Sequence, residues 1–184
     1  MLGAGYLKQK LGCAGTVYDL KLETARDVHE VEALFDLCFA PGREALSSYR
    51  LRDDVASVSQ LNTVARDGAG ILAGAVRFWP VRVAGAPALL LGPIAVHPTR
   101  QGEGLAGDLI REVLSRAAGL GWARVMLVGD APYYQRFGFE RLGGVVMPAP
   151  TNPERVLGRE LVPGAWLDIR GDVTRWKGAV RPGD

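Results

Sequence analysis

The chain has 184 residues, 48% hydrophobic and 23% charged, a balance typical of a globular protein with its own core, which excludes fibrous and disordered classes. Its 22 basic and 20 acidic residues give a net charge of only +2, and the two signs are interspersed, so we expect no nucleic-acid partner. Two cysteines and two histidines are too few for a four-ligand zinc site or a disulfide framework. We therefore expect no metal.

The most apolar segment, residues 86–96, is shorter than a membrane span and is interrupted by Pro87, Gly92 and Pro93. The first residues lack the basic segment and apolar run of a secretory signal. We expect a cytoplasmic protein with no membrane partner.

The N-terminal part of the chain predicts a strand followed by a helix. Residues 1–15 show no period and are expected to form a flexible lead-in. Residues 17–23 alternate apolar and polar side chains, as a half-buried strand requires. Apolar residues then recur at helical spacing, which predicts a helix that begins after Thr24, the expected N-cap, and stops at Pro41. Residues 42–59 have only a weak helical period.

The middle of the chain predicts an antiparallel meander followed by a parallel crossover. Three strand-like runs, residues 61–66, 71–83 and 89–96, are separated by short turns that contain glycine. Residues 105–117 carry apolar side chains at helical spacing, and residues 123–129 form a buried strand pattern. Strand, helix and strand together predict one parallel unit.

The C-terminal part predicts two further strands, over residues 139–147 and 156–169, joined by a proline-rich loop. Because there is no internal repeat and no linker, we expect a single domain over residues 16–175 and a tail over residues 176–184.

Residues 102–107 read Gly-Glu-Gly-Leu-Ala-Gly, which matches the Gly-x-Gly-x-x-Gly fingerprint of dinucleotide-binding folds. In a dinucleotide-binding fold the strand enters the first glycine almost directly, whereas here the polar residues 97–101 intervene. The Gly-Lys-Ser/Thr of a P-loop is absent. The chemistry of a helix N-terminus does not depend on either fold. Its unpaired N–H groups, with glycines that leave them accessible, favour binding of a pyrophosphate.

Residues 96–106, Val-His-Pro-Thr-Arg-Gln-Gly-Glu-Gly-Leu-Ala, resemble the acetyl-CoA pyrophosphate motif of the GNAT superfamily of N-acetyltransferases, with Gln101, Gly104 and Ala106 in the defining positions. Residues 133–139, Tyr-Tyr-Gln-Arg-Phe-Gly-Phe, resemble the second signature of that family. Two motifs in the right order are more specific than either alone. The resemblance covers residues 17–144 and is strongest to the YhbS-type branch of predicted acetyltransferases.

The resemblance implies an α/β fold, namely a mixed, mostly antiparallel sheet of six or seven strands flanked by helices. In this family the fourth and fifth strands diverge and the acyl-CoA lies between them. Pro93 lies inside the expected fourth strand and has no N–H to donate, so we predict a bulge or a diverging edge there.

The residues that the resemblance assigns to acetyl-CoA form two groups. Backbone groups of the strand are expected to bond the pantetheine and to polarise the thioester carbonyl, and the glycine-rich turn is expected to bind the pyrophosphate. The strand residues are Ile94, Ala95 and Val96, and the turn residues are Gln101, Gly102, Glu103, Gly104, Leu105, Ala106 and Gly107. Arg100 and Arg136 are candidate phosphate partners by charge and location, or else solvated surface groups.

Tyr134 is the residue that the resemblance assigns as general acid, since the departing thiolate needs a proton or a strong hydrogen bond. The alternative is that Tyr133 and Tyr134 are both core aromatics. A general base is harder to assign because residues 71–98 contain no Asp or Glu. His97 and Asp130 both remain open as bases, Asp130 with a turn-capping role as its alternative.

The function that the resemblance implies is transfer of an acetyl group from acetyl-CoA to a primary amine, by direct attack in a ternary complex and without a metal. The alternative is a non-catalytic acyl-CoA-binding sensor or regulatory domain. The acceptor, a small-molecule or peptide amine, is expected to lie against residues 41–59, the turn after Asp67 and the C-terminal strands. None of these segments carries a charge pattern that selects an acceptor. Homodimers are frequent in the family.

Overall fold

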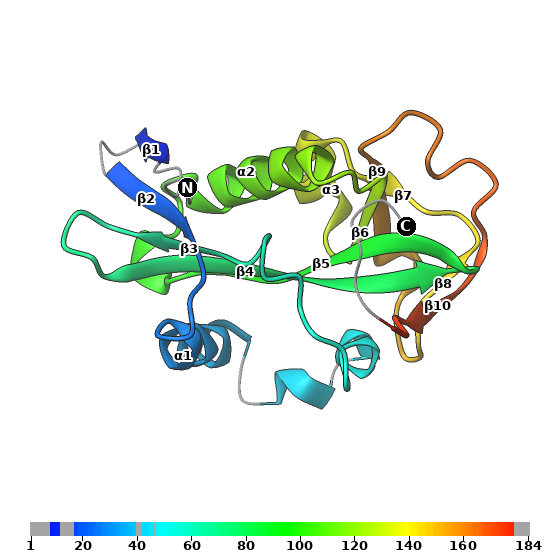
Figure 1. The fold of residues 1–184 in the computed structure, drawn as a ribbon, viewed down its shortest axis with the longest axis horizontal. Coiled ribbons are helices and arrows are strands. Elements are labelled where there is room, and N and C mark those ends of the chain that lie inside the picture. Colours follow the sequence, from blue (N-terminus) through cyan, green and yellow to red (C-terminus); the bar gives the residue numbers. More distant parts are fainter. Residues whose placement is uncertain (1–7, 12–16, 40–41, 46, 179–184) are drawn as a thin grey trace.

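The computed structural model describes residues 8–11, 17–39, 42–45 and 47–178, which form one sheet with helices on both faces (Figure 1). The α-helices are α1 (Val28–Phe39), α2 (Leu105–Gly119) and α3 (Ala131–Tyr134). The 3-10 helices are η1 (Arg43–Ala45), η2 (Ser47–Leu51), η3 (Pro98–Arg100), η4 (Gln135–Phe137) and η5 (Pro153–Arg155). The strands are β1 (Lys8–Leu11), β2 (Val17–Leu22), β3 (Thr63–Arg66), β4 (Leu72–Val83), β5 (Ala86–Val96), β6 (Arg124–Val128), β7 (Glu140–Arg141), β8 (Val145–Val146), β9 (Val156–Glu160) and β10 (Gly171–Arg175).

The sheet has the strand order β1-β2-β3-β4-β5-β6-β9-β7, with β10 beside β4 and β8 beside β10. β5 pairs with β6 in parallel, as β8 does with β10, and the other described pairs are antiparallel. The predicted meander and the parallel crossover are thus confirmed. The dinucleotide-binding alternative is wrong, because a doubly wound fold needs a mostly parallel sheet.

The described residues form ten strands, so the expected number of six or seven is wrong. The segment predicted as one strand over residues 139–147 is divided into β7 and β8, and the last predicted strand ends at Glu160. β10 and β1 were not predicted. Strands of two to five residues give too few positions for an alternating pattern to be recognised.

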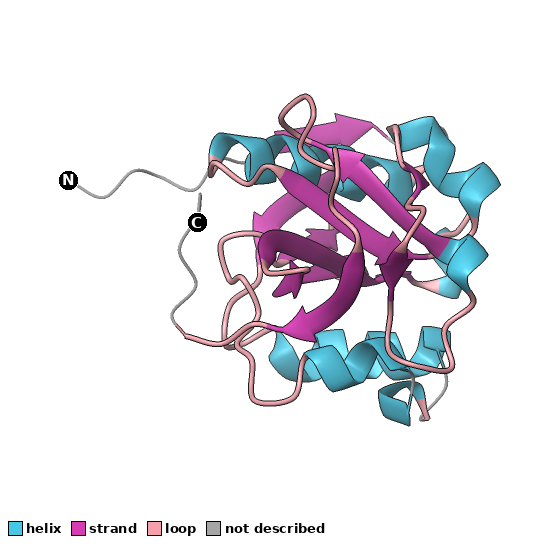
Figure 2. Ribbon diagram, turned by 90° about the vertical axis from the view of Figure 1, so that its right-hand side faces the viewer, coloured by secondary structure: helices cyan, strands magenta, loops and turns pink. Residues whose placement is uncertain are grey.

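Helices cover the two faces of the sheet, with α2 and α3 on one side and α1, η1 and η2 on the other (Figures 1 and 2). The apolar face of α2 places Leu105, Leu109 and Val113 in the main core. On the opposite face, Val31 and Phe35 of α1 belong to a second cluster of buried side chains. Fully burying a side chain of this size stabilises the fold by about 2 kcal/mol.

α1 begins at Val28, four residues after the predicted cap, Thr24. The carbonyl of Asp27 accepts the first helical hydrogen bond, from the N–H of Val31, and the hydroxyl of Thr24 donates to the Asp27 carboxylate. The predicted stop at Pro41 lies outside the described residues. The weakly periodic segment that follows forms the 3-10 helices η1 and η2 rather than an α-helix.

β5 carries the irregularity predicted from Pro93. Val76 of β4 lies opposite Ile94, but Phe78 lies opposite Leu91, so the two residues Gly92 and Pro93 oppose a single residue of β4. Gly92 has a φ of 123°, which only glycine adopts without strain. On its other side β5 is paired with β6 only at Leu89 and Leu90. The bulge is therefore confirmed, and it lies where the two parallel strands separate.

The C-terminal part of the fold extends to Trp176, which sequence analysis assigned to the tail. Its ring is buried and lies 6.3 Å from that of Trp122, edge to face. Residues 179–184 lie outside the described residues. In the part of the chain that is described, no helix has the length and apolarity required to cross a bilayer.

Candidate active site

The N-terminus of α2 opens into a cavity of about 350 Å³. Gly104 is the N-cap, with φ 85°, and Gly102 precedes it with φ 82°, so both adopt a left-handed conformation that favours glycine. No side chain caps this end of the helix. The first N–H groups of α2, which have no intrahelical acceptor, therefore face a cavity that can take an anion.

Six of the seven turn residues predicted to bind the cofactor line this cavity: Gln101, Gly102, Gly104, Leu105, Ala106 and Gly107. Glu103 is not part of the lining, because its carboxylate accepts a hydrogen bond from the hydroxyl of Tyr18 on β2. That contact keeps a negative charge away from the anion site. The side-chain amide of Gln101 donates to the carbonyl of Val96 at 3.2 Å, so it ties the turn to β5.

Two arginines line the same cavity, Arg111 of α2 and Arg136 of η4. Of these two arginines, only Arg136 was predicted as a phosphate partner. Arg111 lies one helical turn beyond Gly107, and this spacing, which places it on the same face of the helix, was the only indication in the sequence. Arg100, the other candidate phosphate partner, instead forms an ion pair with Asp67 at 2.7 Å. One of the two candidate arginines, Arg136, therefore lines the cavity together with Arg111.

A second cavity, of about 320 Å³, occupies the cleft where β5 and β6 separate. Its floor is formed by residues 90–94 of β5, and Leu127 to Asp130 of β6 and the following turn form one wall. Tyr133 lines this cleft and also the cavity at α2. The two cavities are therefore neighbours.

The register of β5 decides which of its peptide groups face the cleft. His97 N–H donates to the carbonyl of Ala73, and Ala95 lies opposite Ala75 two residues earlier. By the alternation of an antiparallel ladder, the peptide groups of Ala95 face β4 and those of Ile94 and Val96 face away from it. Ala95 was expected to offer its backbone to the cofactor, and this register turns its peptide groups away from the cleft.

Tyr134 lines the cleft, and its ring is packed directly over Gly129. A Cβ at position 129 would lie 2.4 Å from Cε2 of Tyr134, so only glycine allows this ring position. Burial raises the pKa of Tyr134 to about 12; Tyr133 adds to the shift, and Arg155 opposes it. The phenol therefore keeps its proton throughout the physiological pH range.

The two candidate bases lie in different places. The ring of His97 caps η3, accepting from Thr99 N–H, and lines neither cavity. Asp130 lines the cleft at the carboxyl end of β6. It occupies the N-cap position of α3, but its carboxylate makes no capping hydrogen bond. The geometry therefore favours Asp130 over His97.

The opposite wall of the cleft comes from α1, η1, η2 and the residue that follows η2, and includes Arg43, Tyr49 and Arg52. The guanidinium of Arg43 binds the carboxylates of Glu32 and Asp36 and donates to the hydroxyl of Tyr49 at 3.0 Å. Sequence analysis predicted that this segment forms the acceptor site, but it singled out none of these side chains. The turn after Asp67, also expected there, does not line the cleft.

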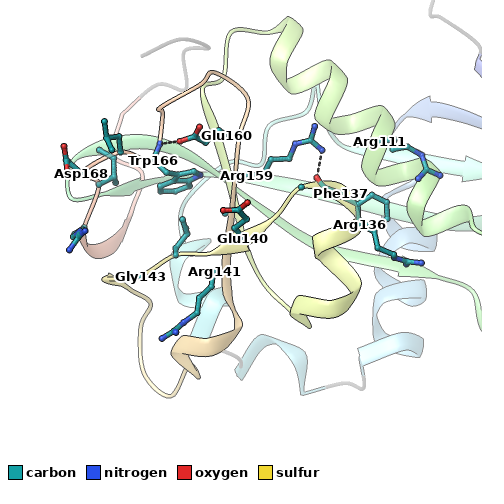
Figure 3. Close-up of a pocket in the computed structure, with 16 residues that line it drawn as sticks. Arg111, Arg136, Phe137, Glu140, Arg141, Gly143, Arg159, Glu160, Trp166 and Asp168 are labelled. Atoms are coloured by element: carbon teal, nitrogen blue, oxygen red, sulfur yellow. Dashed lines mark hydrogen bonds between the residues drawn. The ribbon is translucent and has the colours of Figure 1, made fainter.

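The largest cavity described, about 810 Å³, lies beside α2, η4, β7 and β9 (Figure 3). Arg111 and Arg136 lie at one end and Trp166 and Asp168 at the other (Figure 3). It contains neither the separated part of β5 nor Tyr134, so we do not assign the chemistry to it. Within the described residues, no group of three or more histidine, cysteine or acidic side chains is arranged to hold a metal ion.

Comparisons with known proteins show the family to which the chain belongs. A family model described as an acetyltransferase (GNAT) domain matches residues 60–141. The uncharacterized N-acetyltransferase YhbS of Escherichia coli K12 is 36% identical over 123 residues, which cover 66% of this chain and 72% of that protein.

Two solved structures are similar over most of their length. The crystal structure of YhbS from Escherichia coli in complex with CoA has a TM-score of 0.74 and 26% identity, and the match covers 99% of each chain. A GNAT family acetyltransferase from Brucella melitensis in complex with acetyl-CoA has a TM-score of 0.65 and 29% identity, covering 86% of this chain and 96% of that one. The resemblance in the two motifs thus extends to the whole fold, and the chain belongs to the GNAT superfamily of N-acetyltransferases and is an acyltransferase.

Proposed function

We propose that the protein transfers the acetyl group of acetyl-CoA to a primary amine that attacks the thioester directly in a ternary complex. The observation that carries this proposal is the contact between the two cavities at Tyr133. An anion site at a helix N-terminus is thereby joined to a cleft that contains a protonated phenol and a carboxylate. YhbS binds CoA and the Brucella protein binds acetyl-CoA, which supports the same ligand here.

In the proposed complex the pyrophosphate lies at the N-terminus of α2, with Arg111 and Arg136 beside it. The pantetheine follows β5 and bonds the outward-facing peptide groups of Ile94 and Val96 in place of a neighbouring strand. The N–H of Val96 is oriented to polarise the thioester carbonyl, because Gln101 holds the carbonyl of the same residue.

In the proposed reaction the amine nitrogen bonds to the thioester carbon, and the carbon–sulfur bond breaks. The amine proton leaves toward the carboxylate of Asp130, directly or through water. Tyr134 donates a hydrogen bond to sulfur as negative charge develops there. A thiol has a pKa of about 8.5, so a phenol with a pKa near 12 acts as a donor that stabilises the thiolate rather than as a strong acid.

Calorimetry with acetyl-CoA, followed by turnover measurements on a panel of primary amines, tests this proposal. We expect binding of acetyl-CoA and CoA, and release of CoA that depends on the amine. Absence of binding at millimolar concentration would contradict the whole assignment. Tight binding without turnover on a broad amine panel would instead support the acyl-CoA-binding sensor.

A further inference from the structure

The acceptor side of the cleft carries an excess of positive charge. Its lining contains Arg43, Arg52 and Arg155 but only one carboxylate, that of Asp130. Arg43 is neutralised by two carboxylates of α1, and Arg155 is exposed to solvent. Arg52 is therefore the cation that determines the charge of the interior of the cleft.

Aromatic rings hold Arg52 in place. Its guanidinium carbon lies 3.9 Å from the centre of the Tyr49 ring and 4.7 Å from the centre of the Trp79 ring. The Trp79 ring is fixed in turn, because its Nε1 donates to the carbonyl of Val55 at 3.2 Å. Stacking of this kind orients a guanidinium without neutralising it.

Arg52 has no anionic partner among the described residues. Its Nε and Nη1 atoms are buried and make no hydrogen bond. Burial lowers the pKa of Arg52 to about 10; interaction with the Tyr49 side chain opposes this shift, and the neighbouring cations Arg43 and Arg77 add to it. Arg77 is a useful contrast, because its buried guanidinium binds both Glu23 and Glu32. A buried cation without an anion is unfavourable, and an anion that arrives with a ligand relieves that cost.

The third nitrogen of Arg52 faces the bulge of β5. Its Nη2 atom would lie 3.9 Å from a Cβ at position 92, and the glycine there leaves this approach open. Both residues line the cleft that also contains Tyr134 and Asp130. A group bound to Nη2 therefore shares one small cavity with the groups proposed to act on the thioester.

We propose that Arg52 binds a carboxylate of the acceptor, so that the substrate is a small amine that also carries a carboxylate, as an amino acid does. This inference rests on the proposed function. A carboxylate can accept a charge-assisted hydrogen bond from Nη2, the guanidinium nitrogen that faces the bulge. The cleft volume of about 320 Å³, part of which the acyl end of the cofactor would fill, limits the acceptor to about the size of an amino acid.

Matched acceptors test this inference: an amino acid panel, the corresponding carboxamides, and aminoethyl phosphate as a phosphate-bearing amine. We expect kcat/KM for the carboxylates to exceed that for the amides by about tenfold or more. Arg52→Met removes this preference by raising KM for the carboxylates much more than KM for the amides. Arg52→Lys retains part of the preference.

The control is Arg50→Met, at an arginine outside the cleft lining that donates to the carbonyl of Ala149. This variant keeps the wild-type preference. Equal activity of the wild type on acids and amides, a preference for the phosphate, or an equal loss on all acceptors in Arg52→Met would overturn the inference.

Binding and stability measurements separate this inference from the proposed reaction. N-acetyl amino acids titrated into the CoA complex bind more tightly than their amides, and Arg52→Met abolishes the difference. If that preference appears without any turnover, the inference stands and the proposed reaction fails. Arg52→Met also melts at or above the wild-type temperature, because it removes an unpaired buried charge. A clear decrease in melting temperature would assign Arg52 a structural role and overturn the inference.

Discussion

The two neighbouring cavities are built in opposite ways. The cavity at α2 is formed mainly by consecutive residues from Gln101 to Gly107, and it presents backbone N–H groups and two glycines with positive φ. The cleft between β5 and β6 is formed by side chains from α1, η2 and α3 and by a bulged strand. In the proposed complex the backbone site binds the constant part of the cofactor, and the side-chain site binds the acceptor.

The two cavities also carry their positive charge differently. At α2 it comes from the helix terminus and from Arg111, whose side chain is largely exposed and also pairs with Asp108. In the cleft it comes from Arg52, which is buried and unpaired among the described residues. Solvent and salt screen the first charge and leave the second nearly unscreened. The cleft is therefore the more selective of the two sites.

Tyr134→Phe gives the largest expected effect, because it removes the proposed donor to sulfur and preserves the ring that packs on Gly129. We expect kcat to fall by roughly a hundredfold to a thousandfold while the Kd for CoA stays within a factor of two or so. Steady-state kinetics and calorimetry on the same preparation check this. If the variant has nearly wild-type kcat, the Tyr134 hydroxyl has no role in the reaction and the residue contributes only packing.

Gly102→Asp tests the backbone site. It places a carboxylate at the expected pyrophosphate position, and aspartate tolerates the left-handed conformation better than most residues do. We expect the Kd for CoA to rise by about a hundredfold, or about 2.8 kcal/mol.

Gly85→Asp is the matched control for Gly102→Asp. Gly85 has a φ of 85° and open space around it, as Gly102 does, but it lies in the β4–β5 turn. It should lose a similar amount of stability and bind CoA normally. Equal losses of CoA affinity in both variants would argue against the anion site.

The sequence was sufficient to predict the backbone site because a contiguous motif encodes it. Gly102, Gly104 and the start of α2 follow from local conformational rules, and Pro93 was sufficient to predict the bulge in β5. The side-chain contact of Glu103 could not be predicted because its partner, Tyr18, lies 85 positions away in the chain.

The acceptor side could not be predicted in the same way. Arg52 lies within the weakly periodic segment 42–59. Its proposed role depends on Tyr49, on Trp79 of β4 and on the absence of a carboxylate partner among the described residues. No local sequence pattern indicates that a buried arginine will lack a carboxylate partner. Arg111 was missed because arginine on the polar face of a helix is usually just solvated.

Gly129→Ala tests whether the position of the Tyr134 ring matters apart from its hydroxyl. The added methyl group would overlap Cε2 of Tyr134, so we expect the ring to move and kcat to fall by about tenfold. Gly158→Ala is the control, since a Cβ there would crowd Leu142 at 2.6 Å outside the cleft. Both variants should lose about 1–3 kcal/mol of stability, but only the first should lose activity.

Glu23→Gln tests the ion pairs that hold the acceptor wall. It leaves the buried guanidinium of Arg77 with Glu32 as its remaining partner, so we expect a loss of about 2 kcal/mol in the free energy of unfolding. We expect kcat to change less than threefold or so. The exposed pair Arg141–Glu154 is the control, and Glu154→Gln should cost under about 1 kcal/mol. Equal costs measured by denaturant unfolding would contradict this ranking.

The pH profile should give the smallest effect. Because burial raises the pKa of Tyr134 to about 12, its proton is retained at pH values where an ordinary tyrosine with a pKa of about 10 has lost half of its own. At saturating acceptor, kcat should therefore not decrease between about pH 8 and about pH 10.5. A decrease of kcat to half within that pH range in the wild type, but not in Tyr134→Phe, would mean that burial does not raise the pKa of Tyr134.

The central claim is that one cofactor molecule joins the two cavities. A crystal structure of the acetyl-CoA complex tests it most directly. We expect the pyrophosphate at the N-terminus of α2, the pantetheine along Ile94 and Val96, and the sulfur within hydrogen-bond distance of the Tyr134 hydroxyl. A cofactor bound in the larger cavity between Arg111 and Trp166, with the β5–β6 cleft empty, would contradict the account.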